Sequence, residues 1–147
     1  MFLDKLCKTN PDLIQIAVHM HQQKQILPDT YVVDVDRFLE NAKAILQKAN
    51  EQNIELYYML KQIGRNPYLA KELEKIGYKG AVVVDFKEAE VMMKNHLHIA
   101  HAGHLVQIPS MMINQLVAYG CDYITVYSYE KLVEVNEAAK KIGLVQK

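Results

Sequence analysis

A lysine follows directly after an apolar, aromatic stretch near the middle of the chain. Residues 57–60 read Tyr-Tyr-Met-Leu, Lys61 comes next, and a Gly-Arg-Asn-Pro turn occupies residues 64–67. In parallel α/β sheets, the carboxyl ends of the strands face the ligand site. A lysine there can form a Schiff base with a carbonyl compound if burial lowers the pKa of its amine. The alternative is a lysine that merely ends a strand and extends its charged head into water.

A cluster of histidines is the second group with possible chemistry. His96, His98, His101 and His104 lie within nine consecutive positions, from 96 to 104. If residues 99–106 form a strand, side-chain alternation places His98 and His104 on one face and His101 on the other. Three ligands then do not converge as a zinc site requires, so we predict no metal site.

The last two of these histidines are better placed for a ligand other than a metal. His101 and His104 lie toward the carboxyl end of the predicted strand, so we expect them to line a ligand pocket. The alternative is that they are satisfied by hydrogen bonds within a packed core. Gly103 lies between them and predicts a close approach by a ligand or by another backbone segment.

Two carboxylates at the end of a short apolar stretch invite an acid–base interpretation. Asp34 lies near the end of the stretch at residues 31–35, and Asp36 follows the stretch directly. Capping of the next helix by Asp36 explains one of them without catalysis, and we favour that interpretation.

A regular alternation of strand and helix patterns positions these residues. Strands that recur with a helix between each pair predict βαβ units and a parallel sheet. The chain has no G-x-G-x-x-G after a strand and no Walker-type G-K-S/T, so a nucleotide-binding sheet is disfavoured. A closed (β/α)8 barrel needs roughly 200 residues or more. Five strands, with the possible start of a sixth at residues 144–145, therefore predict an α/β fold that forms part of a barrel. The predicted strands are 31–35, 54–60, 80–84, 99–106 and 123–127, and the predicted helices after the first strand begin near 36, 67, 86, 109 and 129.

The first 30 residues are expected to form a helical arm separate from the barrel domain at 31–147. Asn10, Pro11 and Asp12 form a strong helix start: an N-cap, a proline at the first helical position and an acid in the first turn. The segment has no long apolar core of a signal peptide. The chain also has no uncharged apolar run long enough to span a membrane.

Composition restricts the function further. The 147 residues carry 17 Lys+Arg and 17 Asp+Glu, and this balance disfavours nucleic-acid binding. Cys7 and Cys121 have no C-x-x-C spacing, so we expect reduced thiols in a cytoplasmic protein.

From Tyr31 onward, the pattern resembles the N-terminal domain of alanine-racemase-like enzymes, the fold type III class that depends on pyridoxal 5'-phosphate. The acid-x-acid opening at residues 34–36 is followed by Asn41, and Lys61 stands where the family has its cofactor lysine. The stretch at residues 73–90 looks like the family's helix, glycine, strand and glutamate-rich helix. The resemblance is good over 31–106 and rests on periodicity alone over 107–147.

The resemblance implies that Lys61 holds pyridoxal phosphate as an internal aldimine and moves a proton at the substrate α-carbon, with the cofactor as electron sink. The whole enzyme would then be an amino-acid racemase, an isomerase. Many alanine racemases have a phosphate-binding tyrosine where this chain has Arg65, which could bind the phosphate instead. An ion pair of Arg65 with a nearby acid, such as Glu72, is the alternative. His101 and His104 complete the cofactor-binding residues that we predict.

The family's pyridine-nitrogen partner, phosphate cradle and second, β-rich domain do not fit within 147 residues. We therefore expect the N-terminal portion of an enzyme that acts on a small-molecule amino acid. Its partner would be a missing C-terminal half or further copies in a homo-oligomer, and neither nucleic acid nor membrane is expected. Two alternatives are a pyridoxal-phosphate carrier without racemase activity and a non-catalytic half-barrel fragment that self-associates through its sheet edges.

Overall fold

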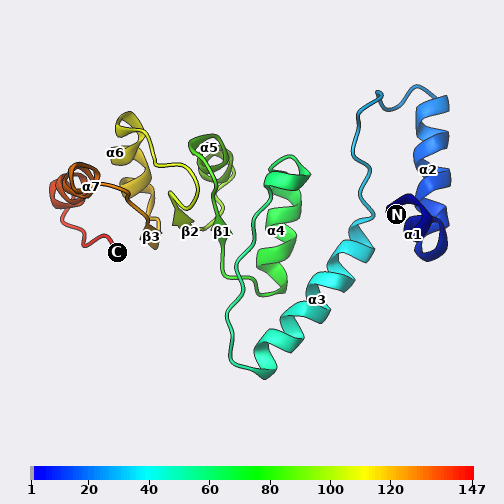
Figure 1. Ribbon diagram of the computed structural model, residues 1–147, viewed down its shortest axis with the longest axis horizontal. Helices are drawn as coiled ribbons and strands as arrows, with labels where there is room; N and C mark the ends of the chain where they lie inside the picture. Colours follow the sequence, from blue (N-terminus) through cyan, green and yellow to red (C-terminus); the bar gives the residue numbers. More distant parts are fainter. Residues whose placement is uncertain (1) are drawn as a thin grey trace. The chain divides into compact units, whose positions relative to one another are not determined.

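The computed structural model describes residues 2–147, which divide into one compact unit up to Asn41 and another from Ala42 to Lys147. The first contains helix α1 (Phe2–Thr9) and helix α2 (Pro11–Gln22), and the chain then enters helix α3 (Val35–Glu51) (Figure 1). The predicted start of α2 is confirmed: Asn10 caps the helix through a bond from the Leu13 N–H, and Pro11 is its first residue. The domain boundary that we place at residue 30 stays a prediction.

The strand that we predict at residues 31–35 is wrong. This segment has no strand hydrogen bonds, because no other strand of residues 2–41 lies beside it. The cap of α3 also differs from our prediction, since Asp34 and not Asp36 is the residue that accepts the Arg37 N–H, at 3.0 Å. The other Asp34 oxygen accepts the Asn10 side-chain amide at 2.6 Å. The Arg37 and Asn10 hydrogen bonds lower the pKa of Asp34.

The second unit contains a parallel sheet of short strands. Strands β1 (Ala81–Val82), β2 (Ile99–Ala102) and β3 (Tyr123–Ile124) are neighbours in chain order (Figure 1). On the outer side of β1, Tyr58 forms a single parallel bridge to Ala81. On the outer side of β3, the Ile124 N–H donates to the Lys147 carbonyl at 2.9 Å, which places the last residue of the chain beside the sheet.

The helices of this unit that follow α3 begin within one residue of the positions predicted from the sequence. Their bounds are α4 (Pro67–Ile76), α5 (Phe86–Lys94), α6 (Ser110–Tyr119) and α7 (Tyr129–Lys141), with a 3₁₀ turn η1 (Lys61–Ile63) before α4. Local chemistry fixes their ends. Asn66 caps α4 and Pro67 begins it, while Gly77 ends it at a φ of 117° that favours glycine.

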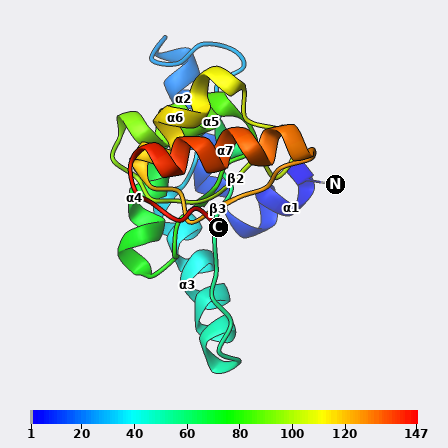
Figure 2. The ribbon, with the colours of Figure 1, turned by 90° about the vertical axis from the view of Figure 1, so that its left-hand side faces the viewer.

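One apolar core joins these helices to the sheet. Val83, Ile99 and Met92 are completely buried, as is Val117 of α6; α5 packs against β2, and α6 packs against α5 and α7. Figure 2 shows α7 at the front of this unit, with the end of the chain returning beneath it. The parallel α/β class that we predict from the sequence is confirmed. Among the described residues, no helix is both long enough and apolar enough to cross a membrane.

Candidate functional site

Lys61 and three residues of neighbouring segments lie just after the carboxyl ends of parallel segments. Lys61 follows the segment that bridges to β1, Asp85 follows the chain leaving β1, and Gly103 follows β2. Thr125 follows β3 directly. Since parallel strands end at the same edge, these positions form one rim of the sheet, the rim where ligands bind in parallel α/β proteins.

Lys61 begins the η1 turn, and its side chain is exposed, so residues 2–147 do not provide the burial that our Schiff-base interpretation calls for. Its amine has no hydrogen bond or ion pair to any of residues 2–147. The residue before it, Leu60, is buried, so the chain leaves the core at this point. The arrangement presents a free primary amine at the rim, where a carbonyl compound can reach it.

Arg65 lies at the other end of the Lys61 turn and is held by Asp85. Its Nη2 is 2.8 Å from Asp85 Oδ2, and both side chains are about a quarter to a third exposed. The alternative that we gave for Arg65, an ion pair with a nearby acid, is therefore what the structure has, but the acid is Asp85; Glu72, our example, pairs with Lys75 of its own helix. The Nε atom of Arg65 is buried and has no partner among the described residues.

Glu88 is a site residue that our sequence analysis missed. It is 1% exposed, and its carboxylate accepts the Val84 N–H at 2.7 Å and the Leu60 N–H at 3.3 Å. The Asp85 carboxylate accepts the Glu88 N–H at 2.8 Å, which is half of a capping box. The Asp-x-x-Glu spacing after an apolar strand was the signal available in the sequence.

His101 lines a cavity of about 370 Å³ on the sheet, together with Val82, Ile124 and Thr125. Its Nε2 is 2.7 Å from the Thr125 hydroxyl, and the direction of that bond depends on the tautomer. Burial, and secondarily the nearby His104, lower the pKa of His101. The ring is therefore biased toward the neutral form, in which one nitrogen accepts and the other donates.

His104 does not share a face with His98, and this expectation is wrong. Strand β2 ends at Ala102, and Gly103 has a φ of 82°, so alternation stops before His104. The rings of His101 and His104 instead approach edge to face, with centroids 5.5 Å apart. His104 itself is exposed. Within residues 2–147, no group of three or more His, Cys, Asp or Glu side chains is arranged to hold a metal ion.

Gly103 brings the backbones of β2 and β3 together at the rim. A Cβ atom at this position would lie far inside van der Waals contact with the Thr125 carbonyl oxygen. The Thr125 N–H donates at 2.9 Å to the carbonyl of Ala102, the residue before Gly103. Of the two approaches that the sequence allowed at Gly103, a ligand or a backbone, the structure has the backbone of Thr125.

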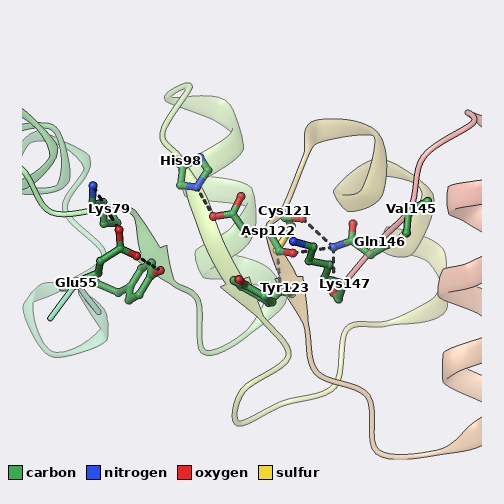
Figure 3. A pocket seen from close by; sticks show the side chains of 10 residues that line it. Glu55, Lys79, His98, Cys121, Asp122, Tyr123, Val145, Gln146 and Lys147 are labelled. Atoms are coloured by element: carbon green, nitrogen blue, oxygen red, sulfur yellow. Dashed lines mark hydrogen bonds and ion pairs between the residues drawn. The ribbon is translucent and has the colours of Figure 1, made fainter. Parts of the chain in front are cut away.

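A second hollow, of about 560 Å³, opens at the amino ends of the strands (Figure 3). His98 there pairs with Asp122 at 2.7 Å, and Glu55 lies 3.6 Å from Lys79. These residues precede the strands, so they lie at the edge opposite to Lys61. In parallel α/β folds this end serves stability, which makes the hollow the weaker candidate for the site.

Comparisons with known proteins bear on the family and the fold of this chain. The family model described as "Alanine racemase, N-terminal domain" matches residues 33–147. The chain is 49% identical over 146 residues to the uncharacterized protein YhfX of Escherichia coli (strain K12), a match that covers 99% of this chain and 38% of that protein. The chain thus spans less than half the length of this relative.

Among solved structures, the fold is similar to that of a D-threonine aldolase from Filomicrobium marinum, with a TM-score of 0.65. The two chains are 19% identical, and the similarity covers 78% of this chain and 31% of the aldolase chain, so it shows the fold alone. The predicted fold, a part of a parallel α/β barrel of the fold type III class, is confirmed. The chain belongs to the alanine racemase N-terminal domain family.

Proposed function

We propose that this chain is the N-terminal portion of a pyridoxal-phosphate-dependent, amino-acid-racemase-like enzyme in which Lys61 holds the cofactor. The observation that carries the proposal is the free Lys61 amine at the carboxyl rim of a domain of this family. The neighbouring cation, Arg65, already forms an ion pair with Asp85, so Lys61 and Arg65 have different roles in this proposal.

The residues present fit the carbonyl end of pyridoxal phosphate better than its phosphate end. Lys61 has a primary amine that can react with an aldehyde, and this amine is not paired with an acid among residues 2–147. Arg65 is already partly neutralised by Asp85, yet a guanidinium has several N–H donors and keeps some for a phosphate oxygen. We propose Arg65 as a secondary phosphate contact, with further contacts supplied by the part of the protein that this chain does not span.

Each side chain of the rim has a separate task in this proposal. The bound cofactor supplies the electron sink that makes the substrate α-proton acidic. Lys61 binds the cofactor and, once its amine is released, carries a proton to or from the α-carbon. His101 and His104 line the cofactor site, and the neutral His101 ring can accept or donate one hydrogen bond without adding charge.

The binding step is tested by trapping. The chain is incubated with pyridoxal phosphate and reduced with borohydride, and the modified peptide is mapped by mass spectrometry. We expect the label on Lys61 and its loss in Lys61→Arg, which keeps the charge but removes the primary amine. Lys71→Arg is the matched control, because Lys71 is an exposed lysine of α4. Equal labelling of many surface lysines would refute the role of Lys61.

A pyridoxal-phosphate carrier is the second candidate, because a lysine at the rim suffices to hold the cofactor, whereas racemisation also needs a second catalytic acid. Racemisation is measured as exchange of the substrate α-proton for deuterium over a panel of amino acids. Cofactor bound at Lys61 without exchange, even after the remaining sequence is supplied, would favour the carrier.

The uncovered sheet supports a proposal about assembly. Val82, Ile124 and Thr125 border an open cavity, whereas parallel sheets are covered on both faces. We propose that the covering element is a C-terminal half equivalent to the unmatched part of the relative, and that copies of the chain associate when this half is absent. Size-exclusion chromatography of the 147-residue chain tests the second statement, and a monomer at all concentrations would contradict it.

A further inference from the structure

Glu88 is unusual among the charged side chains of the chain. It and Lys131 are the charged residues that are buried within residues 2–147. The Lys131 amine has two side-chain partners, the Ser110 hydroxyl at 2.7 Å and the Glu134 carboxylate at 2.6 Å. Glu88 forms no ion pair with any described residue, so its charge is compensated by other means.

Two backbone N–H groups and a helix end provide that compensation. Glu88 Oε2 accepts the Val84 N–H and Oε1 accepts the Leu60 N–H, and both donors are buried. Glu88 also lies in the first turn of α5, where the helix dipole favours negative charge. Hydrogen bonds from backbone N–H groups to a carboxylate are stronger than those between neutral groups.

These two bonds stand in place of two sheet bonds. Tyr58 N–H donates to the Gly80 carbonyl at 3.0 Å, and Val82 N–H donates to the Tyr58 carbonyl at 2.8 Å. A parallel ladder repeats every two residues, so the next bonds would run from Leu60 N–H to Val82 and from Val84 N–H to Leu60. The Glu88 carboxylate accepts both of these N–H groups instead. We call this arrangement of Leu60, Val84 and Glu88 the carboxylate bridge.

The carboxylate bridge also accounts for the turn that carries Lys61. Because Val84 does not bond to it, the Leu60 carbonyl is free to accept the Ile63 N–H at 3.1 Å and the Arg65 N–H at 3.0 Å. These bonds close the 3₁₀ turn whose first residue is Lys61. The far end of the turn is held at the same helix start, through the ion pair of Arg65 with Asp85.

We propose that Glu88 is a positioning residue that ends the pairing of the Lys61 segment with β1 and thereby sets where the Lys61 amine lies at the rim. The positioning of the backbone is independent of any ligand, whereas its consequence for cofactor binding rests on the proposed function. The two parts are measured separately.

The backbone part is tested by amide hydrogen exchange with assigned NMR resonances. In Glu88→Gln the side chain keeps its shape, but its NH2 group must face one of the two N–H donors. We expect the Leu60 or the Val84 amide to exchange at least about tenfold faster than in the unmutated chain. Glu90→Gln is the matched control on the same helix, since Glu90 is partly exposed and, within residues 2–147, its ion pair is with Lys94. Unchanged exchange at both amides in Glu88→Gln would overturn the proposal.

The unmutated chain provides a test that does not depend on the folding of a variant. The Leu60 and Val84 amides must both be protected there, because both are buried and bonded to Glu88. Fast exchange of either amide would overturn the proposal. Glu88→Asp serves as a second variant: the charge is kept, but the shorter side chain cannot reach both donors, so we expect one amide to lose protection.

The consequence for Lys61 is read from the borohydride labelling pattern in variants that match the unmutated chain in circular dichroism. We expect the share of label on Lys61 to fall at least about twofold in Glu88→Gln, relative to the other lysines, and to stay unchanged in Glu90→Gln. An unchanged share in a folded Glu88→Gln would overturn the positioning of the amine. If the unmutated chain carries no label on Lys61, the proposed function fails, while the exchange data still decide the backbone part.

Discussion

Replacing Gly103 by alanine tests the close approach of β2 and β3 at the rim. Gly103 has a φ of 82°, and a Cβ atom there would overlap the Thr125 carbonyl oxygen. Backbone and not a flexible side chain is in the way, so the two strand ends must move apart. The His101–Thr125 hydrogen bond at the same place would be disturbed as well.

The expected loss of stability has two parts. An alanine in the left-handed region costs about 1–2 kcal/mol relative to glycine. Overpacking a tightly packed position costs about 1–3 kcal/mol more. We therefore expect Gly103→Ala to lower the free energy of unfolding by roughly 2–5 kcal/mol, a large share of the stability of an ordinary domain.

Gly120→Ala is the matched control, because Gly120 has a φ of 98° but a Cβ atom at this position would have no neighbouring atom within 4 Å. Urea unfolding followed by circular dichroism gives both free energies. A difference of about 2 kcal/mol between the variants corresponds to about 1 M in the urea midpoint at an m-value near 2 kcal/mol/M. Equal losses in the two variants would refute the contact between Gly103 and Thr125.

Two further measurements follow from the pKa shifts. Burial and His104 lower the pKa of His101 below 6.5, so the unfolded chain takes up this proton first, and stability should fall as the pH drops through about 6.5 until the folded pKa is passed. Urea midpoints at about pH 7.5 and about pH 5 should differ less in His101→Gln, and an identical difference would contradict the assignment. Burial raises the pKa of Cys121 to about 11, whereas Cys7 is exposed, so one thiol should react with a disulfide reagent at about pH 8 before unfolding and two after it. Rapid reaction of both thiols in the folded chain would contradict this.

The helices could be predicted from the sequence because their ends are fixed locally. Asn10 and Asn66 cap helices whose first residue is a proline, and glycines at 77 and 120 end helices in the left-handed conformation. Each of these signals lies within a few residues of the position it fixes. The parallel sheet followed from the alternation of these helices with apolar runs.

The strands were less predictable because pairing depends on residues that are distant in the sequence. The stretch at 31–35 has strand-forming residues but no strand partner among the described residues of its own unit, so residues 31–34 stay irregular and Val35 begins α3. The predicted strand at 99–106 stops at Ala102, where Gly103 turns and Thr125 of the next strand comes close. For this reason the alternation argument failed at His104.

The position of Lys61 depends on a residue that lies outside its own segment of the sequence. The apolar run before it is typical of a strand, and a strand-end lysine would follow from that run alone. The carboxylate that interrupts the pairing comes from α5, after the next strand of the sequence. Asp85 and Glu88 carry the information as an Asp-x-x-Glu pattern, in which the glutamate bonds one residue further back than in an ordinary capping box. In parallel α/β chains, such a pattern after one strand is thus a reason to expect an open ladder, and a turn, at the end of the strand before it.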